Sequence, residues 1–218
     1  MTGLSIILPT YNEKDNIIIL VNKIIKLLKN YKKKEIIIVD DSSPDNTYDL
    51  VKNKFRAKKF IKIFSRKKEF SLAKAIGYGI KKSKGRLIIV MDTDMTHNPN
   101  LITKLIGRSK NYDLVSASRF VKGGSMYNLF HYTCSLIFNF YLKTLLNSKL
   151  NDNLGGYFCV KRKTVMKVNF KKINSCLISA AQQSGRLSIP EFHQPQYLNN
   201  FINSWDSKKN IIFFIKTI

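Results

Sequence analysis

Short apolar runs alternate along the chain with longer segments in which apolar side chains recur at helical intervals. The runs predict strands at residues 4–8, 35–39, 60–64, 87–91 and 114–117, and the helical intervals predict helices at 16–28, 47–55, 71–82, 98–108 and 127–146. Pro9 is expected to end the first strand. Strands of continuous Ile and Val are typical of parallel sheets buried on both faces. The pattern therefore predicts an α/β fold with a mostly parallel central sheet flanked by helices.

Polar clusters follow three of these strands directly, at residues 9–13, 40–45 and 92–97. Parallel strands end at the same edge of a sheet, and ligands of such folds bind outside that edge. Three acidic loops gathered on one edge of a basic protein therefore indicate a binding site there.

The carboxylates of Asp92 and Asp94 stand two positions apart after a buried strand. Alternate residues of an extended chain point to the same side, so both carboxylates can reach one ligand. A hard divalent cation prefers oxygen donors of this kind, and a nucleotide diphosphate supplies the remaining ligands. The alternative is a pair of helix-capping aspartates ahead of Pro99, and the second acidic cluster at Asp40 and Asp41 argues against it.

Composition narrows the choice of partner. A chain of 218 residues predicts one domain, and its 44% hydrophobic content excludes global disorder. With 38 Lys and Arg against 14 Asp and Glu, the net charge of +24 favours phosphate-bearing partners, although a solvated basic surface explains the charge about as well. The basic residues do not alternate with aromatic ones as in a nucleic-acid-binding module, so no nucleic acid partner is expected.

Other features bear on location and domain organisation. Three cysteines without metal-ligand spacing indicate a reducing compartment, and neither a signal peptide nor a membrane-spanning segment is predicted. Of the 38 Lys and Arg residues, 34 lie in residues 1–172 and four in residues 173–218. We therefore expect a main domain at 1–172 followed by a divergent C-terminal tail at 173–218.

Four motifs follow predicted strands in a specific order. They are Leu-Pro-Thr-Tyr-Asn-Glu at 8–13, Val-Asp-Asp-Ser-Ser-Pro-Asp-Asn-Thr at 39–47, Met-Asp-Thr-Asp-Met-Thr-His-Asn-Pro at 91–99 and Ser-Arg-Phe at 118–120. They resemble the signatures of family 2 glycosyltransferases, and within that family the chain is similar to the dolichol-phosphate mannose synthase branch. The resemblance covers residues 4 to about 168. It implies that residues 1–172 form a catalytic domain of the GT-A, nucleotide-sugar-binding type.

The resemblance also implies roles for particular residues. On the donor side, Pro9, Tyr11 and Glu13 would line the nucleotide pocket, and Asp40 or Asp41 would accept hydrogen bonds from base or ribose. Asp92 and Asp94 would hold Mg²⁺ or Mn²⁺ against the diphosphate. Thr96 stands where the family often has a third ligand. Asp94 and Arg119 are the implied catalytic residues, because the guanidinium fork of Arg119 suits a phosphate group. The arginine that the family places after Gly-Gly-aromatic is Phe158 here.

The implied reaction moves a hexose, mannose from GDP-mannose in the preferred version, to a polyprenyl or dolichyl phosphate with inversion. A phosphate acceptor is already ionised at neutral pH and needs no strong general base. The expected location is cytoplasmic, at the surface of an anionic membrane. Two alternatives stay open: a glycosyltransferase acting on a cell-surface polysaccharide precursor, and a catalytically weak homologue that binds nucleotide-sugar without turnover.

Overall fold

The computed structural model describes residues 3–67, 70–120, 129–145, 152–153 and 155–167. The chain divides into two units, Met1–Arg186 and Leu187–Ile218, and every described residue belongs to the first. Its six described strands are β1 (Leu4–Thr10), β2 (Lys34–Asp40), β3 (Ile61–Ser65), β4 (Leu87–Val90), β5 (Leu114–Ser116) and β6 (Phe158–Lys161). The described helices are α1 (Lys14–Leu27), α2 (Thr47–Lys54), α3 (Leu72–Lys82), α4 (Leu101–Arg108), α5 (Leu129–Leu145) and α6 (Arg162–Lys167).

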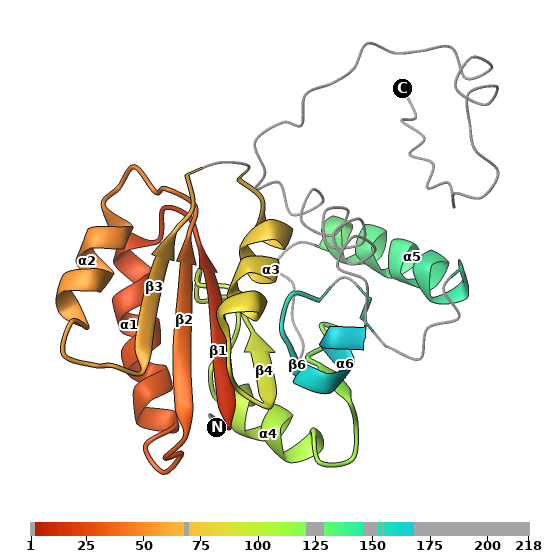
Figure 1. The fold of residues 1–218 in the computed structure, drawn as a ribbon. Helices are drawn as coiled ribbons and strands as arrows, with labels where there is room; N and C mark the ends of the chain where they lie inside the picture. Colours follow the sequence, from red (N-terminus) through yellow and green to blue (C-terminus); the bar gives the residue numbers. More distant parts are fainter. Residues whose placement is uncertain (1–2, 68–69, 121–128, 146–151, 154, 168–218) are drawn as a thin grey trace, which may run out of the picture. The chain divides into compact units, whose positions relative to one another are not determined.

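The strands form one sheet in the order β3-β2-β1-β4-β6-β5. Strands β1 to β4 are parallel, with Ile6 of β1 paired to Ile36 of β2 and to Ile89 of β4. Strand β6 runs antiparallel to both β4 and β5. The predicted α/β fold with a mostly parallel sheet is confirmed, and Figure 1 shows the carboxyl ends of β1, β2 and β3 together at its upper edge.

Helices cover the sheet on both faces, as the continuous Ile and Val runs predict. On one face, Ile6 and Leu8 of β1 pack in a buried cluster with apolar side chains of α1, α2 and α4. On the other face, Ile7 packs with Ile76 and Ile80 of α3. Consecutive residues of β1 point to opposite faces, so both clusters need an apolar residue from this strand. A strand with alternating polar and apolar residues would supply only one of them.

One expectation about the strands is wrong, and one strand was not predicted. Strand β1 continues through Pro9, which stands opposite Val39 of β2, to Thr10. Pairing of β1 with β4 stops at Ile7, so β1 has a β-partner on one side only at Pro9, where a residue without an N–H is tolerated. Strand β6 was not expected, although an aromatic and β-branched run follows Gly156 in the sequence.

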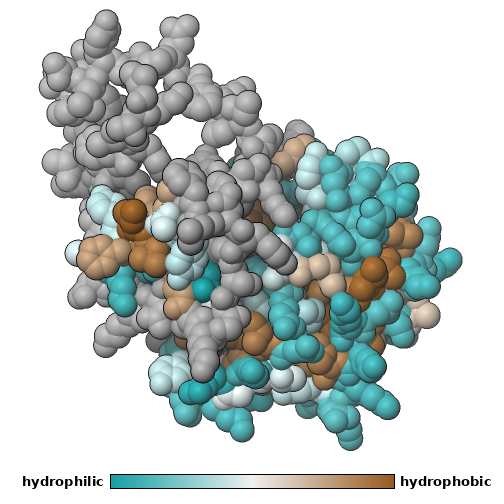
Figure 2. All heavy atoms as spheres, turned by 180° about the vertical axis from the view of Figure 1, so that it is seen from behind, coloured by the Kyte–Doolittle hydropathy of each residue, from teal (hydrophilic) through white to brown (hydrophobic). Residues whose placement is uncertain are grey.

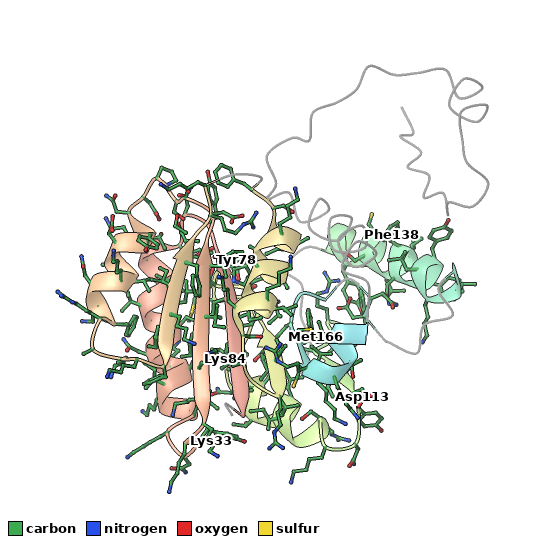
Figure 3. The ribbon with its side chains drawn as sticks, viewed as in Figure 1. Lys33, Tyr78, Lys84, Asp113, Phe138 and Met166 are labelled. Carbon is green, nitrogen blue, oxygen red and sulfur yellow. The ribbon has the colours of Figure 1, made fainter. Side chains whose placement is uncertain are left out.

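The amino-terminal end of the sheet holds a buried polar network. Ser5 Oγ and the Lys84 N–H donate to Glu35 Oε1 at 2.7 and 2.5 Å, and Lys62 Nζ donates to Oε2 at 2.8 Å. Burial opposes ionisation of Glu35, yet these donors outweigh it and lower the pKa of its carboxyl below the ordinary value. Lys33, labelled below the strands in Figure 3, marks this end, opposite the polar loops.

Candidate functional site

The polar loops after β1, β2 and β4 are joined by hydrogen bonds at the carboxyl edge of the sheet. The Asn12 N–H donates to Ser43 Oγ at 2.9 Å, and the Lys14 N–H donates to Asp45 Oδ2 at 3.1 Å. Thr93 Oγ1 donates to the Pro9 carbonyl at 3.3 Å, which links the third loop to the first. The structure therefore brings together the three clusters that the sequence places at strand ends.

Backbone strain gathers in the same loops. In the described part of the chain, the non-glycine residues with positive φ are Asn12 (55°), Ser42 (54°), Asn46 (66°) and Met95 (66°). All four lie in the loops after β1, β2 and β4. Conformations of this kind cost free energy and cluster at functional sites, where the surrounding contacts hold them.

Asp40, the last residue of β2, and Asp41, which follows it, are two buried carboxylates with different partners. Asp40 accepts hydrogen bonds from the Ser43 N–H at 3.0 Å and from Ser43 Oγ at 2.5 Å. Asp41 Oδ2 accepts from the Ser71 N–H at 3.1 Å, and Arg66 Nη1 lies 3.0 Å from Asp41 Oδ1. Arg66 Nη1 donates a hydrogen bond to Oδ2 at 3.4 Å, whereas Oδ1 is buried and forms no hydrogen bond with the described residues.

Burial dominates the titration of both carboxyls. It raises the pKa of Asp40, against the hydrogen bonds from Ser43. It also raises the pKa of Asp41 to about 6, because the charge of Arg66 and the Ser71 N–H offset only part of the desolvation. The role of Asp40 or Asp41 as an acceptor for base or ribose stays a prediction.

The three residues expected to line the nucleotide pocket differ in exposure. Pro9 is buried, Tyr11 is 54% exposed, and Glu13 is half-buried with Oε2 accepting from Asn16 Nδ2 at 2.9 Å. An exposed aromatic ring in the loop after β1 offers a stacking surface for a base. Their role in binding stays a prediction.

Asp92 and Asp94 lie half-buried in the loop after β4. Asp94 Oδ1 accepts hydrogen bonds from the Thr96 N–H at 3.0 Å and from Thr96 Oγ1 at 2.6 Å, so Thr96 orients this carboxylate. A Cβ placed on Gly156 would lie 3.4 Å from Asp92 Oδ2, so this glycine lies next to the carboxylate.

These residues fit a divalent cation that is shared with a diphosphate. Two carboxylates supply hard oxygen donors, and Mg²⁺ is typically held by one or two carboxylates together with substrate phosphates. Within the described ranges, no three His, Cys, Asp or Glu residues form a group that could hold a metal without such help.

Arg119 forms a two-pronged ion pair that the sequence did not indicate. Its Nε and Nη2 donate to Asp152 Oδ2 and Oδ1 at 2.9 and 3.0 Å, and its N–H donates to Oδ2 at 3.2 Å. The Asp152 side chain is fully buried, whereas that of Arg119 is 34% exposed. The fork expected to face phosphate groups thus binds a carboxylate, and Nη1 is the guanidinium nitrogen outside these bonds.

Helix α5 carries an exposed apolar face that is joined to this ion pair. Leu136, Ile137, Phe140 and Tyr141 are 43%, 69%, 69% and 55% exposed. Asn139 of the same helix accepts from the N–H and Nδ2 of Asn153, the neighbour of Asp152. Figure 2 shows brown side chains at its left, beside the grey atoms, and mostly teal ones at its right; Figure 3 labels Phe138 on α5.

Phe158 is paired with Val90, the last residue of β4. It stands in β6 and packs against the apolar cluster of Ile7, Ile76 and Val160. None of the described helices is a candidate membrane span.

Comparison with family models gives one extensive match. The model described as Glycosyl transferase family 2 matches residues 5–168, about three quarters of the chain. A model described as RNA methyltransferase domain matches residues 157–217, well under half of the chain and largely outside the described residues.

Two curated proteins are similar over most of the chain. A dolichol-phosphate mannosyltransferase from Pyrococcus furiosus is 33% identical over 193 residues, which is 84% of this chain and 53% of that protein. An uncharacterized glycosyltransferase from Synechocystis is 29% identical over 164 residues, 74% of this chain and 51% of that protein. The chain spans about half the length of these curated relatives.

Solved structures share the fold at low identity. Glucosyl-3-phosphoglycerate synthase from Mycobacterium tuberculosis, in complex with Mn²⁺, UDP and phosphoglyceric acid, matches with a TM-score of 0.59 and 18% identity over 84% of this chain and 66% of that one. TarS from S. aureus matches with a TM-score of 0.55 and 18% identity over 84% of this chain and 56% of that one.

Proposed function

Because the chain belongs to glycosyltransferase family 2, we propose that it transfers a hexose, with inversion, from a nucleotide-sugar to a polyprenyl phosphate. The preferred donor is GDP-mannose. The observation that carries the proposal is the convergence of two carboxylate pairs, Asp40 with Asp41 and Asp92 with Asp94, on hydrogen-bonded loops at one edge of a GT-A sheet. One pair suits the nucleoside and the other a cation on its diphosphate.

On the donor side, Pro9, Tyr11 and Glu13 line the nucleotide pocket, and Asp40 or Asp41 accepts hydrogen bonds from base or ribose. Asp92 and Asp94 hold Mg²⁺ or Mn²⁺, with Thr96 beside Asp94. The bound cation neutralises charge on the diphosphate. A similarly folded protein that was solved with Mn²⁺ and UDP supports the presence of a divalent cation and a nucleoside diphosphate.

The transfer itself needs alignment and charge stabilisation more than proton transfer. An oxygen of the acceptor phosphate forms a bond to the anomeric carbon while the bond from that carbon to the diphosphate oxygen breaks, so the nucleoside diphosphate leaves with the electron pair. The acceptor is ionised beforehand, so no general base has to take a proton. Asp94 would help to hold the cation that neutralises the leaving diphosphate. Arg119 would donate to a phosphate oxygen from Nη1, while Asp152 accepts from its other donors and fixes the guanidinium.

Two observations favour a lipid-linked acceptor. The similar P. furiosus protein is a dolichol-phosphate mannosyltransferase. The apolar face of α5, with Ile137 and Phe140 both 69% exposed, is joined through Asn139 to the loop that holds Arg119. We place the catalytic domain at 1–172, with 173–218 as a divergent tail, on the cytoplasmic surface of an anionic membrane.

The test is a two-stage assay on the whole chain. A thermal-shift panel of GDP-mannose, GDP, UDP-glucose and UDP, each with and without Mn²⁺, identifies the donor, because a bound ligand raises the melting temperature by mass action. Radiolabelled donor is then incubated with a polyprenyl phosphate, and a chloroform-extractable, mild-acid-labile product is expected. Absence of any stabilisation by nucleotide would contradict the proposal at its first step.

A second candidate is a homologue that binds the donor without efficient transfer. It is favoured by the engagement of the Arg119 fork with Asp152 and by the packing of Phe158 in the apolar cluster. Metal-dependent donor binding without labelled lipid would support this candidate.

A further inference from the structure

The imidazole of His97 lies against the metal-site loop in a fixed orientation. Its Nδ1 accepts a hydrogen bond from the Asp92 N–H at 3.0 Å. The ring stacks on Tyr157, with centroids 5.0 Å apart and an interplanar angle of 20°. Tyr157 is 2% exposed, and its hydroxyl donates to the Asn98 carbonyl at 3.2 Å.

The hydrogen bond at Nδ1 defines the state of the ring. A nitrogen that accepts from an N–H carries no proton, so the neutral ring has its proton on Nε2. Nε2 lies 3.7 Å from Asp92 Oδ2, too far for a hydrogen bond but close enough for attraction between the N–H dipole and the carboxylate. One ring therefore contacts the backbone of Asp92 and faces its side chain.

Gly156 lies beside this arrangement. A Cβ there would lie 3.7 Å from His97 Cε1 and 3.4 Å from Asp92 Oδ2, so the glycine lies next to both groups. Tyr157, the next residue, leads into β6. The stack thus joins the loop after β4 to the segment that enters β6, and the sheet itself holds the imidazole.

We infer that His97 is a positioning residue for the cation site: it fixes the backbone at Asp92 so that the Asp92 carboxylate faces the metal and diphosphate. This inference rests on the proposed function. His97 is not itself assigned as a ligand, because its Nδ1 is engaged with the Asp92 N–H and Nε2 faces a carboxylate. Groups that hydrogen-bond to metal-binding residues orient them, and loss of such groups weakens metal binding.

Two substitutions separate the roles of the ring nitrogens. In His97→Asn, the amide oxygen can take the place of Nδ1 and accept from the Asp92 N–H, whereas His97→Ala removes the acceptor. Two kinds of binding are measured. Mn²⁺ binding in the presence of GDP or UDP is detected by electron paramagnetic resonance of the free Mn²⁺, and nucleotide binding without metal is measured in EDTA. Hydrogen exchange of the Asp92 amide is measured in the ligand-free protein, with Tyr157→Phe as a control that keeps the stacked ring.

The expected effect of His97→Ala is a loss of Mn²⁺ affinity of about 10- to 100-fold with faster exchange of the Asp92 amide, while binding in EDTA changes little. His97→Asn should recover most of the Mn²⁺ affinity and the amide protection. A general loss of structure would instead lower binding with and without metal alike, and that result would overturn the inference.

Wild-type Mn²⁺ affinity in His97→Ala, or unchanged exchange of the Asp92 amide, would also overturn it. If the unmodified protein binds no Mn²⁺ with either nucleotide, the proposed function fails first and the inference fails with it. The two failures are distinguishable, because the unmodified protein still binds Mn²⁺ when the inference alone fails and does not bind it when the proposed function fails.

Discussion

At the scale of single residues, the Asp94 carboxylate combines two roles that a substitution can separate. It accepts two hydrogen bonds from Thr96, which hold the loop, and it is the proposed ligand of the cation. Asp94→Asn keeps an acceptor oxygen for Thr96 but removes the negative charge. We expect Mn²⁺-dependent GDP binding to be lost with little change in melting temperature, measured by calorimetric titration and thermal unfolding.

The matched control is Asp113→Asn, the same change in an exposed ion pair with Lys161. Asp113 lies just before β5, and its substitution should leave metal-dependent binding unchanged. If Asp94→Asn retains wild-type Mn²⁺-dependent GDP affinity, Asp94 is not a ligand.

Asp41 gives a prediction about pH. Burial raises its pKa from 3.8 to about 6, so the folded protein binds this proton more tightly than the unfolded chain does. The contribution of Asp41 to the free energy of unfolding should therefore fall as pH rises from about 4 to about 6, whereas the lowered pKa of Glu35 contributes in the opposite sense. Asp41→Asn should remove this contribution in urea titrations, although the raised pKa of Asp40 leaves a further one of the same sign.

The protonation of Asp41 should also affect the affinity for the nucleotide. Donors on a base or ribose stabilise the ionised carboxylate, so nucleotide affinity should be higher at pH 7 than at pH 5 in the wild type and less pH-dependent in Asp41→Asn. An identical pH profile for the two proteins would show that Asp41 does not contact the nucleotide.

Arg119 and Asp152 depend on each other. Arg119→Lys keeps the positive charge but cannot donate to both Asp152 oxygens from a planar fork. Because the Asp152 side chain is fully buried, we expect urea unfolding to show a loss of about 1–3 kcal/mol. Lipid-phosphate transfer should fall as well; wild-type stability and turnover in Arg119→Lys would show that the pair is dispensable.

At the scale of secondary structure elements, two glycines provide a matched pair for testing the packing. A Cβ on Gly85 would lie 2.5 Å from the Ser5 N and Oγ atoms, beside the Glu35 network, and a backbone atom cannot move aside cheaply. A Cβ on Gly107 of α4 would meet nothing within 4 Å. Gly85→Ala should cost about 3 kcal/mol of unfolding free energy, whereas Gly107→Ala should add up to about 1 kcal/mol by favouring the helix.

Urea titrations of both variants measure these changes, and nucleotide binding by the folded fraction should be unaffected in both. Equal stability of the two variants would show that the close packing of Gly85 against β1 does not occur in solution.

The elements differ in how far the sequence predicts them. Strands β1, β2 and β4 are predictable because each contains a continuous apolar run, and β3 because apolar residues flank Lys62 in a short segment. Their direction follows from the intervening helices. Strand β6 has four residues and pairs with β4, which lies about 70 positions earlier, so only tertiary contacts stabilise it. Pro9 stays in β1 because the pairing with β4 has already ended, a fact of register that no local pattern contains.

The site divides in the same way. Asp40, Asp41, Asp92 and Asp94 could be placed at one edge because parallel strands end together. The pairing of Arg119 with Asp152 and the stack of His97 on Tyr157 join segments that are far apart in the sequence, and side-chain geometry alone decides them. The positions of the acids were thus predictable, but their partners were not.

At the scale of the whole molecule, charge and apolar exposure together predict a location. The net charge of +24 attracts an anionic bilayer over roughly the Debye length, about 10 Å at 0.1 M salt. Charge alone gives reversible binding, and the apolar face of α5 can insert into the interface once the surfaces meet. The two contributions can be measured separately, because salt weakens the first and substitution removes the second.

We therefore expect the protein to float with vesicles that contain anionic lipid and not with purely zwitterionic ones, and to dissociate partly as salt rises. The double variant Ile137→Ser with Phe140→Ser should bind anionic vesicles more weakly at high salt than the wild type, since only electrostatic attraction is left to it. Tyr112→Ser, which changes an exposed aromatic outside α5, is the matched control and should bind normally.

Loss of vesicle binding in both variants alike would assign the effect to general surface hydrophobicity, and wild-type binding of the double variant would show that α5 does not contact the membrane. Because Asn139 joins α5 to the Asp152 loop, the double variant should also transfer sugar more slowly to vesicle-embedded polyprenyl phosphate, while its nucleotide affinity in solution stays unchanged.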